Sequence, residues 1–371
     1  MNRRFGTEPK VMFVIDAFTA GGAQQNLQNL LPEFIHNGFS VDLVLIQDAN
    51  FELDLSFLAS LGVRIIRLSA RNMRDFKKLW QLRHIINDTD PDAIFANLYW
   101  SQIWTGICLY FNVKIELIWV EHNTYYNRNF AKWFVFKFLQ KNKIRIFAVS
   151  QEILLFLQKK KISNIKIIPN CACKYGDRST ANLEHPEILF VGRLVEQKNP
   201  LLAIEAFYEG LTNNLLPTHA RLTFLGSGPM ETQCKDLAAK LDLVSKIDFK
   251  GFVKPEIVAE SMRRAHILLM TSSFEGSPLV RLEAMINGMT IVTTRTAGLS
   301  GILLDQNSNP RLPGIFIVDN SSKSIATSLY EAFKPQLWTQ LEMDRRIKLG
   351  ESFSPSNAYK NYLVSANLQP H

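Results

Sequence analysis

Residues 266–288 read HILLMTSSFEGSPLVRLEAMING, and this stretch places a strand, a turn and a helix in succession. The apolar run at its start predicts a buried strand. Ser277 and Pro278 predict the start of the helix, because they put a hydroxyl at the cap and a proline in the first turn. Glu275 then lies in the turn, and Glu283 lies inside the helix, about a turn and a half from its start. The two carboxylates therefore do not share one helical face.

The same succession repeats along nearly the whole chain, and alternating strands and helices predict parallel sheets covered by helices on both faces. Helical segments such as QNLQNLLPEFIHNG and FKKLWQLRHIIND separate the expected strands. These strands are VMFVID (11–16), VDLVLI (41–46), VRIIRL (63–68), AIFAN (93–97), IELIWV (115–120), IRIFAVS (144–150), IKIIP (165–169), ILFVGR (188–193), RLTFLG (221–226), KIDFKGF (246–252), HILLMT (266–271) and TIVTT (290–294).

Between the two runs of strands, residues 170–187 are polar and without periodicity, which predicts a linker. We therefore predict an α/β protein of two Rossmann-like, doubly wound parallel-sheet domains, residues 1–175 and 176–350. Ligands of such sheets bind beyond the carboxyl ends of the strands. Two sheets facing each other would place a ligand in a central cleft.

Composition agrees with two domains, since 371 residues of which 47% are hydrophobic can form two cores. The net charge of +8 is uneven: residues 1–180 carry 23 Lys and Arg against 15 Asp and Glu, whereas the rest of the chain is balanced. This asymmetry favours an anionic partner for the N-terminal half, with solubility alone as the alternative.

Several protein classes are disfavoured by the sequence. The four cysteines have no CxxC spacing and no HExxH motif is present, which argues against a disulfide framework and a zinc site, and for a reducing compartment. The first apolar run is too short for a signal sequence. Residues 93–113 are uncharged and long enough to span a bilayer, but they divide into a strand and a helix with polar groups that suit hydrocarbon poorly. Residues 88–92, formally D-x-D, predict a solvated loop and no metal.

Two turns carry cations or glycines beside helix starts. After the strand ending at Gly192, Arg193 and Lys198 precede a helix that Asn199 could cap, and two cations there suit a diphosphate. The alternative is that each is a solvated surface charge. Gly22, in the turn after the first strand, would let the backbone approach an anion, although a Gly-Gly pair is more often only a tight turn. The G-x-G of residues 224–233 lacks a third glycine and predicts a turn.

Residues 275–283 offer three kinds of contact. A carboxylate accepts hydrogen bonds from two hydroxyls of a diol, and the free amides of Gly276, Ser277 and Leu279 suit a phosphate. The turn thus has one phosphate site between two hydroxyl sites, which is the layout of a sugar nucleotide. A salt bridge from Glu283 to Arg281 is the structural alternative.

Seven segments together resemble the motif series of the retaining glycosyltransferases of family 4. Their order and spacing cover almost the whole chain. They are GGAQ (21–24), VEHN (120–123), AVS (148–150), VGRLVEQKNP (191–200), LGSGP (225–229), FKGFV (249–253) and EGSPLVRLEAMINGMTIVTT (275–294). The resemblance implies the GT-B fold, with the acceptor bound by domain 1–175 and the donor by domain 176–350. Residues 351–371 would form a final helix that crosses back to the N-terminal domain.

The resemblance also assigns roles. Arg193 and Lys198 would bind the donor diphosphate, Glu283 the ribose hydroxyls and Glu275 the hydroxyls of the transferred sugar. His122 would contact the donor sugar, and Gly22 would approach its phosphate. The catalytic set would be Glu275, His122, Arg193 and Lys198. The donor-binding set would be Gly22, Arg193, Lys198, Val253, Glu275, Gly276, Ser277, Pro278, Leu279 and Glu283. Arg281 departs from the family pattern, which is apolar there, and residues 294–305 lack the usual Pro-Glu pair.

The implied activity is metal-independent and cofactor-independent transfer of a hexosyl or N-acetylhexosaminyl group, with retention, from a UDP- or GDP-sugar to a glycan or lipid-linked acceptor. The implied setting is bacterial surface polysaccharide synthesis. The alternatives are a sugar-nucleotide epimerase or hydrolase of the same fold, and a non-catalytic nucleotide-sugar-binding subunit. No nucleic-acid partner is expected.

The expected location is the cytoplasm, with the basic half of the chain on an anionic membrane surface at the cytoplasmic face of the inner membrane. Residues 128–143 carry apolar side chains nearly all round a helix and predict a core helix. The membrane expectation therefore rests on net charge and on the resemblance.

Overall fold

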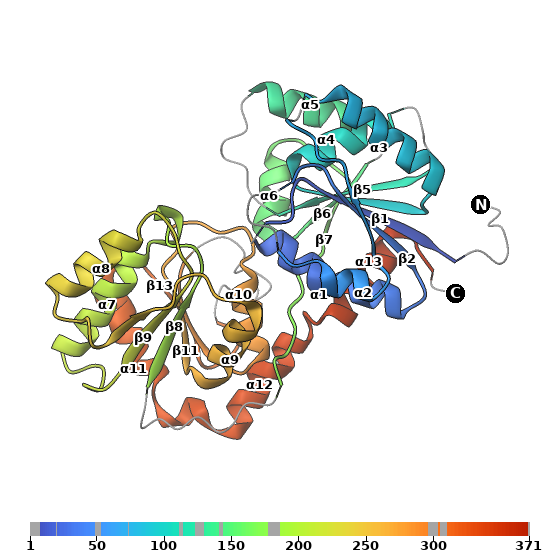
Figure 1. Cartoon of the computed structure of the whole chain (residues 1–371). Helices are drawn as coiled ribbons and strands as arrows, with labels where there is room; N and C mark the ends of the chain where they lie inside the picture. Colours follow the sequence, from blue (N-terminus) through green and yellow to red (C-terminus); the bar gives the residue numbers. More distant parts are fainter. Residues whose placement is uncertain are drawn as a thin grey trace. The chain divides into compact units, whose positions relative to one another are not determined.

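The computed structural model describes residues 8–19, 21–48, 53–72, 74–110, 114–122, 130–140, 144–176, 186–295, 303–304 and 310–369. The chain forms two compact units: unit 1 is Met1–Cys171 with Pro355–His371, and unit 2 is Ala172–Ser354. Figure 1 shows helices on both faces of the sheet in each unit.

Unit 1 contains a seven-stranded sheet in the order β3-β2-β1-β4-β5-β6-β7, and each neighbouring pair is parallel. Its strands are β1 (Lys10–Ile15), β2 (Ser40–Leu45), β3 (Arg64–Arg67), β4 (Ala93–Asn97), β5 (Glu116–Glu121), β6 (Arg145–Ala148) and β7 (Ile165–Ile167). Its helices are α1 (Gly22–His36), α2 (Ser56–Ser60), α3 (Phe76–Thr89), α4 (Tyr99–Cys108), α5 (Phe130–Gln140), α6 (Gln151–Lys159) and α13 (Pro355–Ala366).

The core of unit 1 joins the first and last parts of the chain. Phe34 of α1 meets Tyr359 of α13 edge to face, with ring centroids 4.9 Å apart, and Tyr362 lies 5.1 Å from Phe95 of β4. Helix α13 follows unit 2 in sequence yet packs into this core. The uncharged stretch 93–113 begins as strand β4 and continues as helix α4, as predicted.

Unit 2 contains a six-stranded parallel sheet in the order β10-β9-β8-β11-β12-β13. Its strands are β8 (Glu187–Val191), β9 (Arg221–Leu225), β10 (Ile247–Phe249), β11 (Ile267–Met270), β12 (Thr290–Thr294) and β13 (Ile315–Val318). Its α-helices are α7 (Pro200–Thr212), α8 (Glu231–Lys240), α9 (Pro255–Arg264), α10 (Leu279–Ile286), α11 (Ser322–Ala332) and α12 (Gln340–Glu351), and its 3-10 helices are η1 (Glu196–Lys198) and η2 (Pro335–Trp338).

The fold prediction of two Rossmann-like parallel-sheet α/β domains is confirmed. The expected strands all appear, but β13 was not predicted, because IFIV is short and lies between turns without an alternating pattern. The prediction of a core helix at 128–143 is wrong for the described part. Helix α5 buries only one side, with Phe136, Leu139 and Gln140, and leaves Phe134, Val135 and Phe138 exposed.

Candidate active site

Each sheet reverses its strand order once, and these reversals locate the candidate sites. In unit 1 the reversal lies between β1 and β4, and in unit 2 between β8 and β11. Doubly wound sheets bind ligands beyond the carboxyl ends of the strands at such a point, because the loops there diverge to opposite faces. The predicted cations follow β8 and Glu275 follows β11, so both lie at the reversal of unit 2.

Hydrogen bonds join the loops after β8 and β11. Thr271 Oγ1 donates to the Asn199 carbonyl over 2.7 Å, and the Ser273 amide donates to the Gln197 carbonyl over 2.8 Å. These bonds bring together two predicted residues that are 77 positions apart, since Lys198 Nζ donates to Glu275 Oε1 and forms an ion pair with it.

The Glu275 carboxylate is 7% exposed and is held through a single oxygen. Ser272 Oγ also donates to Oε1, over 2.8 Å, and Ser272 is fixed in turn by Thr294, whose hydroxyl donates to the Ser272 carbonyl over 2.6 Å. Glu275 Oε2 has no hydrogen-bond partner among the described residues. One oxygen is therefore anchored, and the other can accept from a ligand hydroxyl.

Arg193 is exposed and has no ion-pair partner within the described part of the chain. A guanidinium that has no carboxylate partner keeps its charge available to an anion. The cap predicted at Asn199 is only partly present: Asn199 precedes α7 with Pro200 in its first turn, but its backbone is left-handed (φ 47°) and its side chain makes no capping bond.

Glu283 lies in the middle of α10, is 7% exposed, and is held by Tyr175. The Tyr175 hydroxyl donates to Glu283 Oε1 over 2.8 Å. Burial raises the pKa of Glu283, and the bond from Tyr175 opposes that rise. Glu283 Oε2 has no partner among the described residues, so the alternative of an ion pair with Arg281 is not formed. Arg281 itself is buried.

The helix start predicted at Ser277 is displaced by one residue. Pro278 is the N-cap, no side chain caps the helix, and α10 begins at Leu279. Ser277 is buried, and its backbone precedes the helix in a non-helical turn with Gly276. Val253 lies in the turn between β10 and α9 and packs against the second core cluster of unit 2.

In unit 1, His122 directly follows β5 and is 94% buried, with 6% of its surface exposed. Its Nε2 lies 3.0 Å from Asn97 Oδ1, at the end of β4. The Asn97 amide donates to the Phe95 carbonyl over 3.2 Å, which directs its oxygen toward the histidine. Nε2 is therefore the donor, and the proton on it leaves Nδ1 as an acceptor.

Nδ1 of His122 is buried and has no partner among the described residues. Burial lowers the pKa of His122 to about 4, so the ring is neutral at physiological pH. Such a ring can accept a hydrogen bond through Nδ1 but carries no positive charge. Sequence reasoning located His122, but it missed Asn97, whose only signal is its place at the end of a neighbouring strand.

Gly22 is the first residue of α1, and a methyl group built on it would meet no atom within 4 Å. The glycine is therefore not required by local packing, and its exposed amide is open at the helix start. Asp16, at the end of β1, accepts hydrogen bonds from the amides of Trp100 and Ser101 over 3.3 and 2.7 Å. This carboxylate thus fixes the first turn of α4.

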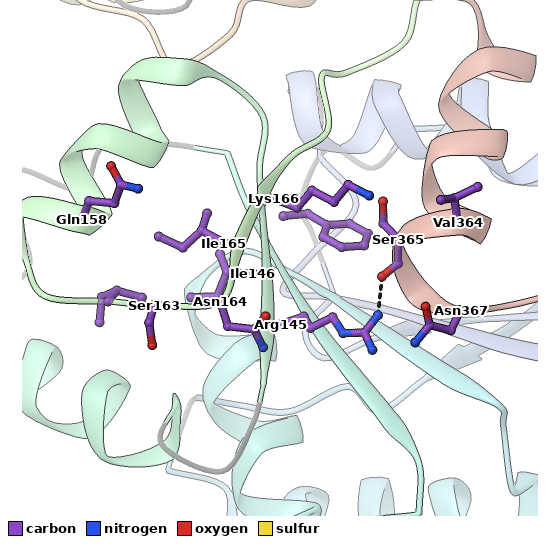
Figure 2. Close-up of a pocket in the computed structure, with 12 residues that line it drawn as sticks. Arg145, Ile146, Gln158, Ser163, Asn164, Ile165, Lys166, Val364, Ser365 and Asn367 are labelled. Carbon is purple, nitrogen blue, oxygen red and sulfur yellow. Dashed lines mark hydrogen bonds between the residues drawn. The ribbon is translucent and has the colours of Figure 1, made fainter. Parts of the chain in front are cut away.

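A pocket of about 670 Å³ lies elsewhere in unit 1, at the amino-terminal ends of β6 and β7, against the end of α13. Figure 2 shows Arg145 reaching the Ser365 carbonyl, to which it donates a hydrogen bond, and Arg145 also pairs with Glu116 over 3.0 Å. None of the predicted site residues lines this pocket. It lies at the opposite end of these parallel strands from the edge that carries His122.

Among the described residues, no group of three or more His, Cys, Asp or Glu side chains could hold a metal ion. The same part of the chain contains no helix that is long and apolar enough to cross a bilayer. Residues 88–92 do not form one loop as predicted, because Asp88 and Thr89 end α3 and Asp90 follows as its C-cap. Residues 294–305, where the sequence lacks the usual Pro-Glu pair of the family, lie mostly outside the described residues.

Two family models match the chain. Residues 20–172 match Glycosyltransferase Family 4, and residues 175–348 match Glycosyl transferases group 1. A Campylobacter jejuni α-1,4-N-acetyl-D-galactosaminyltransferase that acts on a diNAcBac-PP-undecaprenol-linked glycan is 22% identical over 289 residues, which is 74% of this chain and 76% of that protein. A Methanocaldococcus jannaschii glycosyltransferase is 32% identical over 139 residues, which is 38% of this chain and only a third (33%) of that protein.

Among solved structures, Anabaena HepE in complex with UDP aligns with a TM-score of 0.79 at 15% identity, covering 96% of this chain and 99% of that chain. The lipopolysaccharide outer core galactosyltransferase WaaB aligns with a TM-score of 0.71 at 17% identity, covering 96% and 98%. At such identities the structures show the shared GT-B fold. With the two family models, they place this chain among the group 1, family 4-like glycosyltransferases of the GT-B fold.

Proposed function

We propose that the protein transfers a hexosyl or N-acetylhexosaminyl group, with retention, from a UDP- or GDP-sugar to a hydroxyl of a glycan or lipid-linked acceptor. The observation that carries the proposal is the pair that Lys198 forms with Glu275 across the loops after β8 and β11, with the exposed Arg193 in the same loop as Lys198. Glu283 adds a second carboxylate with one available oxygen. Cations suit a diphosphate, and carboxylates that each have one oxygen without a partner suit the sugar hydroxyls on either side of it.

In this proposal the chain itself compensates the charge of the leaving group. Lys198 has three N–H donors, so it can keep its bond to Glu275 while another donor faces a phosphate oxygen. Arg193 supplies a second positive charge, and the amides at the start of α10 supply partial ones. No metal or cofactor is needed, because two cations and a helix start stabilise the developing negative charge.

The transfer step needs no protein nucleophile. The bond between the anomeric carbon and the diphosphate oxygen breaks, the acceptor oxygen bonds to the same face of that carbon, and the acceptor proton goes to the departing phosphate oxygen. Glu275 accepts from hydroxyls of the transferred sugar through Oε2, and the neutral ring of His122 offers Nδ1 as an acceptor in unit 1. We assign the acceptor to unit 1 and the donor to unit 2.

Known relatives support the substrate classes. The Anabaena structures contain UDP, UDP with glucose, and UDP-glucose, which supports a nucleotide-sugar donor. The Campylobacter enzyme acts on an undecaprenol-linked glycan, which supports a lipid-linked acceptor. A Bacillus subtilis poly(glycerol-phosphate) α-glucosyltransferase and WaaB support a role in bacterial surface polymers.

The experiment is a transfer screen with UDP- and GDP-sugars and a mixture of lipid-linked acceptors, analysed by mass spectrometry. Arg193→Ala and Lys198→Ala should each lower transfer about 100-fold or more, because each removes a charge on the leaving group. Arg264→Ala, in the exposed i,i+4 pair of α9, is the control. Full activity in both site variants would refute the assignment, and rapid conversion of donor without acceptor would favour an epimerase or hydrolase.

We also propose that unit 1 docks on an anionic membrane through the outer surface of helices α3 to α5, which places the enzyme at the cytoplasmic face of the inner membrane. Phe76 and Trp80 of α3 and Phe134 and Phe138 of α5 are at least half exposed. Helices α3 to α5 carry five Lys and Arg against one acidic residue. Exposed aromatic rings beside basic residues suit the interface of an anionic bilayer.

Flotation with vesicles of phosphatidylglycerol and phosphatidylcholine tests this docking. A smaller fraction of the double variant Trp80→Ala/Phe134→Ala should float with the vesicles. Leu341→Ala changes an exposed apolar residue of unit 2 and should float to the same extent as the natural chain. Binding that does not depend on the anionic lipid would exclude the proposed surface.

A further inference from the structure

Tyr175 is held against helix α10 by its backbone as well as by its hydroxyl. The Tyr175 amide donates to Asn287 Oδ1 over 3.0 Å, and Asn287 Nδ2 donates to the Glu283 carbonyl over 2.7 Å. Asn287 follows Glu283 by four positions, so both lie on the same side of the helix end. The segment that begins unit 2 is therefore pinned where its tyrosine can reach Glu283.

The hydroxyl of Tyr175 is consequently a fixed donor. Its ring packs against the same core cluster as residues of α10, which limits its rotation. Burial and the neighbouring Glu283 carboxylate raise the pKa of Tyr175, so the phenol keeps its proton and can only donate to that carboxylate. Glu283 Oε1 thus already accepts one hydrogen bond, over 2.8 Å, while Oε2 accepts none from the described residues.

A carboxylate has about four lone-pair sites, and an oxygen that already accepts from a fixed phenol is a weaker acceptor for a further hydroxyl than the oxygen that has no partner. We propose that Tyr175 is a specificity-determining residue that reserves Glu283 Oε1, so that Glu283 grips one ribose hydroxyl of the donor nucleotide through Oε2. This inference rests on the proposed function, in which Glu283 binds the ribose.

The test compares the binding of UDP, 2′-deoxy-UDP and 3′-deoxy-UDP to the full chain by titration calorimetry, with the guanosine series in parallel. In the natural protein, one deoxy analogue should bind within about 2-fold of the parent nucleotide, and the other should bind about 10-fold more weakly or worse, because it loses a hydrogen bond to a charged group. In Tyr175→Phe both oxygens are open, so the two penalties should become similar.

Tyr208→Phe, on α7 of the same unit, is the matched control and should keep the asymmetry. The pH dependence gives a second readout that a merely structural loss would not move. The bond from Tyr175 holds the pKa of Glu283 down, so Tyr175→Phe raises it, and nucleotide affinity should then fall at a higher pH than in the natural chain as the solution is acidified.

Three results would overturn the inference. Equal large penalties for both analogues in the natural protein would mean that the ribose displaces Tyr175, and this measurement stands even if the variant does not fold. An unchanged asymmetry in Tyr175→Phe would mean that other groups create it. If neither UDP nor GDP binds the natural chain, the proposed function fails and the inference fails with it. If a nucleotide binds but the two deoxy analogues bind alike, only the inference fails.

Discussion

Glu275 and Glu283 are eight positions apart, yet different parts of unit 2 hold them. Lys198 and Ser272 hold Oε1 of the first, and Tyr175 holds Oε1 of the second. Each side chain therefore presents one oxygen at a defined place, which costs less binding free energy than ordering a mobile carboxylate when a ligand arrives. Substitution of Lys198 or Ser272 should thus weaken the same contact as substitution of Glu275.

His122 gives a prediction about pH. Its folded pKa of about 4 lies below the unfolded value of about 6.5, so between these limits the unfolded chain binds a proton that the folded chain does not. Stability should therefore fall as the pH drops from 6.5 towards 4, by up to about 1.4 kcal/mol per pH unit from this residue. Urea unfolding at pH 5 and 7 should show a larger difference in the free energy of unfolding for the natural chain than for His122→Gln.

The ring itself can be observed independently. Nitrogen NMR at pH 6 should show a neutral imidazole with its proton on Nε2, because Asn97 Oδ1 accepts from that atom. An imidazolium at pH 6, or a proton on Nδ1, would contradict the described hydrogen bonds.

At the scale of elements, the cations of unit 2 depend on how two turns stack. The turn after β9 lies directly on the turn after β8: the Leu194 amide donates to the Ser227 carbonyl over 3.0 Å, and the Met230 amide donates to the Leu194 carbonyl over 3.0 Å. Gly228 permits this approach, since a methyl group built on it would lie 2.3 Å from the Leu194 carbonyl oxygen. The stacking positions the segment that ends in Lys198.

Gly228→Ala should therefore separate the two turns. We expect a loss of about 1–3 kcal/mol in the free energy of unfolding, as for other overpacked sites, together with weaker nucleotide binding as Lys198 shifts. Ser227→Ala is the control, because Ser227 is exposed and contributes its carbonyl, which the substitution keeps. Thermal unfolding and nucleotide titration of both variants measure the two effects, and a Gly228→Ala chain that behaves like the control would contradict this description.

The elements also show what the sequence could predict. The β-branched runs predicted the strands and the order of the two domains, because buried parallel strands carry a strong local pattern. The helix at 128–143 was predicted wrongly as a core helix, because a pattern of apolar residues does not tell whether another layer covers them. Tyr175 carried no local signal, and the only signal of Asn97 was its place at the end of a strand. Their partners, Glu283 and His122, are 108 and 25 positions away and meet them only in the folded chain.

On the scale of the whole molecule, unit 1 is discontinuous, and its last helix completes its core. Helix α13 supplies Tyr359, Tyr362 and Leu363, which are buried against Phe34 and Phe95 of the first part of the chain. Unit 2 lies wholly within Ala172–Ser354 and has its own two core clusters. Unit 1 therefore requires the end of the chain for its core, and unit 2 does not.

A chain that stops at Ser354 should lose the fold of unit 1 and keep that of unit 2. Deleting each buried aromatic side chain costs about 3–5 kcal/mol, so the loss of several rivals the whole stability of a domain. Tyr359→Phe is the control: the Tyr359 hydroxyl is buried with no partner among the described residues, so its removal should be neutral or stabilising. Limited proteolysis with mass spectrometry should leave only a fragment of unit 2 in the truncated chain, and equal resistance of both units would contradict the prediction.

The central claim is that unit 2 binds a nucleoside diphosphate through Lys198 and Glu283, and calorimetric titration of UDP and GDP tests it most directly. Lys198→Ala and Glu283→Ala are compared with the natural chain and with Lys240→Ala, which removes an exposed cation of α8. We predict that one nucleotide binds the natural chain and Lys240→Ala equally, and binds each site variant about 10-fold more weakly or worse. No binding of either nucleotide, or equal binding by all four proteins, would contradict the claim.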